Sequence, residues 1–159
     1  MNIIITLPIE LVAEIAEGRK QVEIRRNIPI SFNTHQEVVW VKAKGSDKVP
    51  LCFEVSHFEE DNDTNAVWLR YGKQIGVLYA WYQKYVRNAR KVAIWHIKRV
   101  HIFMPNLTFS KTFGGIKAPQ SYVYTDVRLE SVMIQVEKTY CYVIDGKTFR
   151  KVPREKAVQ

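Results

Sequence analysis

The stretch at residues 18–25, Gly-Arg-Lys-Gln-Val-Glu-Ile-Arg, constrains the fold of this chain more than any other. Val22 and Ile24 alternate with polar residues, which is the period-2 pattern of a β-strand. If these two side chains face the core, the opposite face carries Gln21, Glu23 and Arg25. Gly18 precedes the strand and tolerates a backbone bend that other residues rarely adopt. The pattern therefore predicts a strand that starts after a bend.

Three charged side chains crowd this strand and its entrance: Lys20, Glu23 and Arg25. A carboxylate, a guanidinium and an ammonium on one short segment can bind a polar, planar ligand by directional hydrogen bonds. The alternative is an ion pair on a solvated strand face, because most charged side chains lie at the surface. The charge pattern alone leaves both interpretations open.

The stretch fits Gly-x-Lys-x-x-Glu-x-Arg, and in this it resembles the ASCH domains (activating signal cointegrator homology), which are related to the PUA RNA-binding fold. All four motif positions match: Gly18, Lys20, Glu23 and Arg25. Residues 68–77 and 118–124 also resemble bacterial and phage members, in the same order. The resemblance covers about residues 1–125 and implies an α+β fold, a small mixed β-barrel with helices packed at its ends.

One compact domain suits a chain of 159 residues with 47% hydrophobic content. We expect residues 126–159 to form a C-terminal β extension packed on the ASCH-like part. In this extension, Ser131–Lys138 and Thr139–Val152 are expected to be strands, and Asp145-Gly146 suits a hairpin turn.

Periodicity predicts the other elements of the chain. The expected strands are Ile3–Thr6, Glu37–Ala43, Leu51–Phe58 and Lys91–Phe103, with an acidic loop at residues 59–63. The expected helices are Ile9–Glu17, one from about Asn65 that Gly72 and Gly76 break, and Val77–Asn88. On the last helix Leu78, Trp81, Tyr82 and Tyr85 are assigned to the core side, which leaves its basic side for a phosphate backbone.

Charge is unevenly distributed along the chain. Residues 1–64 hold seven Lys and Arg against eleven Asp and Glu, whereas residues 65–159 hold seventeen against five. No acidic residue occurs between Asn65 and Thr125. A surface of one sign attracts polyanions, and phosphate contacts dominate nucleic-acid affinity. The expected phosphate-binding residues are Lys84, Arg87, Arg90, Lys91 and Arg99.

The resemblance implies that a nucleotide, with RNA favoured over DNA, is held in a cleft beside the motif strand. Glu23 would then accept hydrogen bonds from a base edge, Arg25 would stack on the base or bind phosphate, and Lys20 would add a point charge. The expected cleft residues are Lys20, Glu23, Arg25, Gln120, Ser121 and Tyr122.

A hydrolase is the main alternative. Some small ASCH proteins that resemble this chain at the motif are amidohydrolases acting on acetylated cytidine, with a catalytic lysine at the position of Lys20. They carry threonine in place of Glu23 and need a further glutamate, a place that Glu59 or Glu60 could fill. The catalytic set of this alternative is Lys20, Glu23 and Glu59. An ASCH ribonuclease and a module for an acidic protein partner are further alternatives.

Several classes of function and location are not expected. Cys52 and Cys141 form no disulfide framework, and the four histidines lack metal-ligand spacing, so neither a cofactor nor a metal is expected. The first fifteen residues carry Glu10 and Glu14 and do not suggest a signal peptide, and no apolar run approaches membrane-spanning length. We therefore expect a cytoplasmic protein without a membrane partner.

Overall fold

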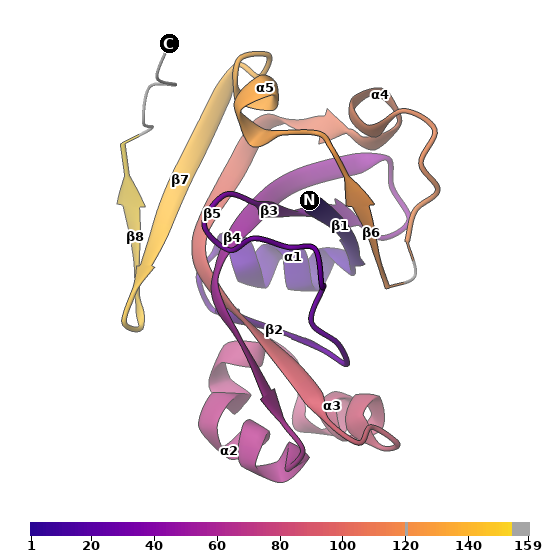
Figure 1. Ribbon diagram of the computed structural model, residues 1–159. Coiled ribbons are helices and arrows are strands. Elements are labelled where there is room, and N and C mark those ends of the chain that lie inside the picture. Colours follow the sequence, from indigo (N-terminus) through magenta and orange to yellow (C-terminus); the bar gives the residue numbers. More distant parts are fainter. Residues whose placement is uncertain (120, 154–159) are drawn as a thin grey trace.

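The structure, a computed structural model, describes residues 1–119 and 121–153. Its strands are β1 (Asn2–Leu7), β2 (Val22–Arg25), β3 (Val38–Ala43), β4 (Lys48–Asp61), β5 (Val92–Thr108), β6 (Tyr122–Thr125), β7 (Lys138–Asp145) and β8 (Thr148–Val152). Its helices are α1 (Ile9–Ala16), α2 (Thr64–Ile75), α3 (Tyr79–Val86), α4 (Phe109–Phe113) and α5 (Leu129–Met133). The strands form one mixed sheet with helices around it (Figure 1), which confirms the expected α+β class.

The sheet runs in the order β6-β1-β3-β4-β5-β7-β8, and β2 pairs with β5 beside this path. β1 and β3 are parallel, and the other pairs are antiparallel. β5 pairs with β4 along one edge, and along its other edge it pairs first with β2 and then with β7. The sheet curls (Figure 1) but does not close into the expected barrel: within residues 1–119 and 121–153, no backbone pairing joins β6 to β8.

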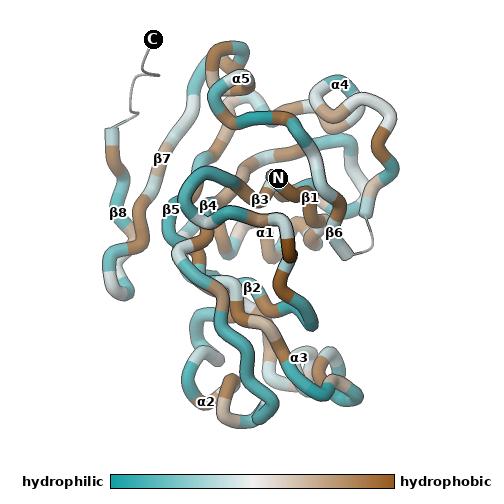
Figure 2. The backbone as a smooth tube through the Cα atoms, viewed as in Figure 1, coloured by the Kyte–Doolittle hydropathy of each residue, from teal (hydrophilic) through white to brown (hydrophobic). Residues whose placement is uncertain are grey.

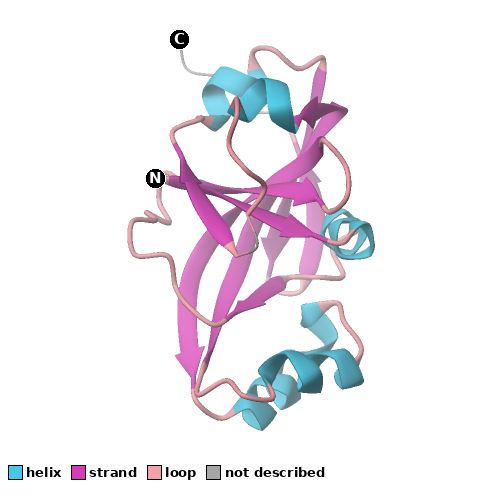
Figure 3. Cartoon of the chain, turned by 90° about the vertical axis from the view of Figure 1, so that its right-hand side faces the viewer, coloured by secondary structure: helices cyan, strands magenta, loops and turns pink. Residues whose placement is uncertain are grey.

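Three apolar clusters hold the helices on the sheet. Val12 and Ile15 of α1 pack against the inner face, which includes Phe53 and Trp95. α4 and α5 cover a second cluster at one end of the sheet. α2 and α3 cover a third cluster at the other end, formed with β2 and the start of β5 (Figure 3). β1 belongs to the most hydrophobic stretches of the backbone (Figure 2), and Ile3, Ile4 and Ile5 are fully buried.

The expected strand and helix at the N-terminus, the β3–β4 hairpin and the C-terminal hairpin are all present. Three local expectations were wrong. The acidic segment continues β4 to Asp61, because residues 57–61 pair with β5. α2 runs through Gly72 without a break and ends at Ile75, so only the expected break at Gly76, whose φ of 83° favours glycine, is present. Residues 129–133 form α5, so the expected strand at 131–138 is helical in its first part.

The face of α3 also differs from the expectation. Tyr82 is buried, whereas Leu78 and Trp81 are exposed. Since the helix covers only Tyr79–Val86, its eight residues bury one narrow stripe instead of a wide apolar face. Among the described residues, no helix is both long and apolar enough to span a bilayer.

Candidate functional site

Gly18 places the motif strand by making the turn between α1 and β2. Its φ is +80°, and a Cβ atom built on it would lie 2.3 Å from the ring of Phe149. The C-terminal hairpin therefore packs directly on this turn. The side-chain amide of Gln21 donates to the carbonyl oxygen of Lys147 at 3.0 Å, which adds a second contact between hairpin and motif.

Lys20 lies below the surface, with 1% of its area exposed. Its Nζ donates to the carbonyl oxygens of Val22 (2.7 Å) and Ile75 (2.8 Å) and lies 3.1 Å from Glu23 Oε1. An ammonium has three protons, so these three acceptors satisfy it. Burial lowers the pKa of Lys20, and the carboxylate of Glu23 opposes that shift.

Glu23 is buried on the opposite face of β2 from Val22 and contacts both motif cations. Its Oε2 accepts hydrogen bonds from Nε (3.3 Å) and Nη2 (3.2 Å) of Arg25. Burial by itself would raise the pKa of Glu23, but Lys20 and Arg25 outweigh it and lower that pKa. The three charged residues thus form one internal network, which we call the motif network.

Arg25 is the charged motif residue that lies nearest the surface, and it connects the motif network to β6 and β5. Its Nη1 donates to the carbonyl oxygen of Ser121 at 3.1 Å, and its guanidinium lies over the ring of Trp95 at 5.9 Å. Trp95 in turn meets Tyr122 edge to face. The structure therefore brings Ser121 and Tyr122 to the motif, whereas Gln120 lies outside the described residues. A ligand cleft at this place stays a prediction.

One aromatic residue of α3, Tyr85, lies near the motif network and stacks on a second, Trp81. Burial raises the pKa of Tyr85 while the charge of Arg25 lowers it, so the phenol is within electrostatic reach of the motif. Trp81 stacks on Tyr85, with ring centroids 5.3 Å apart and planes at 8°, and 49% of Trp81 is exposed. Lys84 and Arg87 line an open depression of about 450 Å³ between α2 and α3. We call Arg25, Trp81, Lys84, Tyr85 and Arg87 the α3 surface.

The other predicted phosphate-binding residues are dispersed. Arg90 is exposed just beyond α3. Lys91 forms an ion pair with Glu60 at 3.2 Å, and Arg99 lies farther along β5, with its Nε 3.8 Å from Glu54. Within the part of the chain that the structure describes, Lys84, Arg87 and Arg90 enter no ion pair. The acidic end of β4 thus neutralises some of the basic residues and leaves those of α3 available.

Glu59 belongs to a different cluster, on the face of the sheet that α2 covers. Its Oε1 accepts from the Tyr71 hydroxyl (2.6 Å) and lies 2.9 Å from His96 Nε2, and its Oε2 accepts from Arg70 (2.8 Å). Burial raises the pKa of Glu59, but these three hydrogen bonds together lower it to about 2. The partners of Glu59 therefore differ from those of Lys20, and a joint catalytic role for the two stays a prediction.

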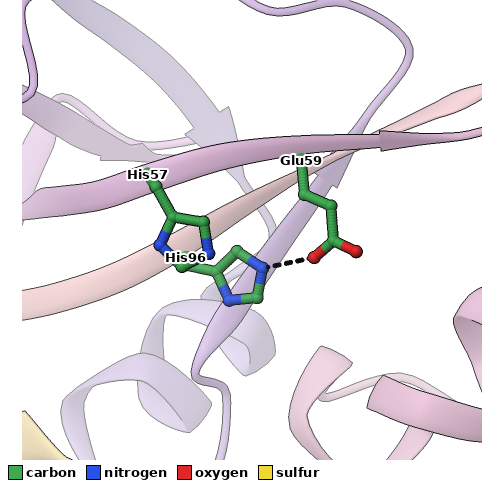
Figure 4. Close-up of side chains that lie close together, drawn as sticks. All are labelled: His57, Glu59 and His96. Atoms are coloured by element: carbon green, nitrogen blue, oxygen red, sulfur yellow. Dashed lines mark hydrogen bonds and ion pairs between the residues drawn. The ribbon is translucent and has the colours of Figure 1, made fainter.

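His57 completes that cluster. Its ring stacks on His96, with centroids 4.1 Å apart and planes at 11° (Figure 4). Burial lowers the pKa of His96, and the nearby His57 ring adds to that shift against the pull of Glu59. No sequence spacing reveals this cluster, because His57 and Glu59 lie on β4 and His96 on β5. Sequence reasoning had no signal for the cluster, because Glu59 was expected in the acidic loop that follows the predicted strand at residues 51–58.

Comparisons with known proteins agree with this fold, although no family model matches the chain. A curated ASCH domain-containing ribonuclease from Zymomonas mobilis subsp. mobilis is 26% identical over 140 residues, which cover 84% of this chain and 93% of the relative. The crystal structure of ASCH from Zymomonas mobilis aligns with a TM-score of 0.69 at 19% identity, over 86% of this chain and 96% of that one. A serine-to-alanine mutant of the Zymomonas protein gives 0.70 at 17% identity, with the same coverage.

Proposed function

This chain belongs to the ASCH domain family, and from that premise we propose that it binds single-stranded RNA through the α3 surface. The observation that carries the proposal is the Trp81–Tyr85 stack, in which Trp81 is half exposed, on the same helix as the two basic residues of the α3 depression. Stacked aromatic rings accept unpaired bases of any sequence, and flanking cations bind the phosphates. The relative described as a ribonuclease supports RNA as the polymer.

In this proposal the motif network positions Arg25. Glu23 holds two of its nitrogens, and the Ser121 carbonyl holds a third. Because Lys20 is buried and satisfied, it stabilises Glu23 and has no exposed surface to offer a ligand. The guanidinium of Arg25 is thereby fixed beside Trp95 and Tyr85, where it can contact a phosphate or the face of a base.

RNA cleavage is the second candidate function, and the description of the relative favours it. The same RNA contacts would serve it, with the strand held across the α3 surface. The geometry supports the amidohydrolase alternative less than it supports RNA binding. Lys20 would have to give up one of three short contacts before its amine could attack a substrate or accept a proton.

The test is fluorescence anisotropy with a labelled single-stranded RNA, its duplex and the matching DNA, across a salt series. The proposal expects the single-stranded RNA to bind best and Arg25→Ala to weaken it. Gel electrophoresis of the same samples reports cleavage. RNA that binds but stays intact would support the binding function and exclude cleavage under these conditions. Absence of binding at low salt would refute the proposal and turn attention to acylated nucleosides.

A further inference from the structure

We propose that His57, Glu59 and His96 form a binding site for a divalent transition-metal cation of the zinc class. Each residue offers one ligand atom, and the three atoms lie within 4.8 Å of one another (Figure 4). Two imidazoles and one carboxylate are a common ligand set for zinc with an open coordination position. The site lies on the α2 side of the sheet and is independent of the proposed RNA contacts.

The strands place the three side chains together for a simple geometric reason. His57 and Glu59 are two residues apart on β4 and therefore point to the same face. His96 of β5 is the direct partner of His57 in the register. An irregularity between Val55 and His57 makes Ser56 the extra residue of β4, and such bulges re-aim neighbouring side chains.

Outer contacts already hold two of the three groups, His57 and Glu59. The Ser56 hydroxyl bonds His57 Nδ1 at 2.9 Å, which leaves Nε2 of that ring available. The Tyr71 hydroxyl donates to Glu59 Oε1, and Arg70 holds Glu59 Oε2. Such second contacts fix the tautomer of a histidine and the direction of a carboxylate.

Charge at the site also suits a cation. Arg70 is shared between Glu59 and Asp61 (2.6 Å), so one guanidinium faces two carboxylates. His96 now lies in hydrogen-bond contact with Glu59 through Nε2; on metal binding its proton would sit on Nδ1, which frees the Nε2 lone pair. In a tetrahedral zinc site the ligand atoms lie roughly 3.4 Å apart, given bonds of about 2.0–2.1 Å. The two imidazole planes are stacked at 11°, so the ring of the exposed His57 has to turn and approach before both histidine lone pairs meet one ion.

The test is calorimetric titration of ZnCl2 into metal-stripped, untagged protein. One equivalent should bind, and His57→Ala and Glu59→Gln should each weaken the affinity more than tenfold. Tyr71→Phe, which removes an outer contact only, should cost about tenfold. His35→Ala is the matched control, because His35 is an exposed histidine in the turn before β3 and is not among the three ligand residues, and it should bind as the wild type does.

A second readout reports the geometry of the site. Co²⁺ in place of zinc should give visible absorption bands that His57→Ala abolishes and His35→Ala keeps. Because His57 is exposed, its replacement should not prevent folding, so the result stays interpretable even if a His96 variant does not fold. Zinc binding that is equal in His57→Ala and wild type, or no saturable binding, would overturn the proposal.

Discussion

The motif network and the His57–Glu59–His96 cluster lie on opposite faces of the sheet where β2 pairs with β5, and they differ in how fully their polar atoms are satisfied. Lys20 and Glu23 are buried and form an ion pair with each other, and Glu23 also pairs with Arg25. The histidine cluster is partly exposed and keeps a ring nitrogen available. The motif residues Lys20 and Glu23 thus act mainly within the structure, where they fix the position of Arg25. The cluster of His57, Glu59 and His96, which no motif indicates, has polar atoms that solvent or a ligand can reach.

The largest expected effect is on the buried pair. Glu23→Gln leaves the Lys20 ammonium without its counter-ion, and breaking such a pair costs about 3–5 kcal/mol of unfolding free energy. The double variant Lys20→Met with Glu23→Gln removes both charges and should be more stable than Glu23→Gln alone. Urea denaturation measures both. If the single variant unfolds like the wild type, the network does not stabilise the fold.

The stability of the protein at acid pH should also depend on Glu23. The pKa of Glu23 in the folded protein lies below its ordinary value of about 4.5, because Lys20 and Arg25 outweigh burial. Glu23 therefore contributes stability that is present above that ordinary value and is lost as the pH falls toward the lowered pKa. Thermal unfolding between neutral pH and pH 3 should show a loss in the wild type that is smaller in Glu23→Gln. Equal slopes would mean that Glu23 does not titrate in this way.

Removal of the exposed aromatic ring should weaken RNA binding without unfolding the protein. Trp81→Ala should cost about 1–3 kcal/mol of binding free energy, the range found for one base stacked on an aromatic side chain. Anisotropy measures it, and Ile134→Ala serves as control, since Ile134 is also exposed but lies beside α5 at the other end of the sheet. Equal losses in the two variants would argue against a stacking role for Trp81.

A smaller change is expected from one phosphate-binding side chain. Arg87→Glu should weaken binding to all sequences alike and lower the slope of log affinity against log salt by about 0.7 for each phosphate that is no longer neutralised. Lys138→Glu makes the same change of charge on β7, away from the α3 surface, and should keep the slope. If both variants alter the slope equally, binding depends on net charge and has no defined surface.

The sequence predicted those parts of the molecule that depend on local pattern. Alternation at Val22 and Ile24 placed the motif strand, and Gly18 placed the turn before it. The resemblance to ASCH domains supplied the fold class, which the Zymomonas structures confirm.

Tertiary contacts explain what the sequence did not reveal. Trp81 was assigned to the core, because helical spacing cannot show that α3 buries only a narrow stripe around Tyr82. The burial of Lys20 depends on the carbonyl of Ile75, which is 55 residues away in the chain. The pairing of His57 with His96 depends on the register of two long strands and on the irregularity at Ser56.

The most direct test of the account is a titration of the ¹⁵N-labelled protein with a short single-stranded RNA, followed by NMR. The account predicts that the Trp81 indole signal and the backbone amides of α3 and of Arg25 shift together with one affinity. The buried Trp40 indole, which donates to the carbonyl of Val127, should stay unchanged. Shifts confined to the β7–β8 hairpin, or none at all, would contradict the proposal that the α3 surface binds RNA.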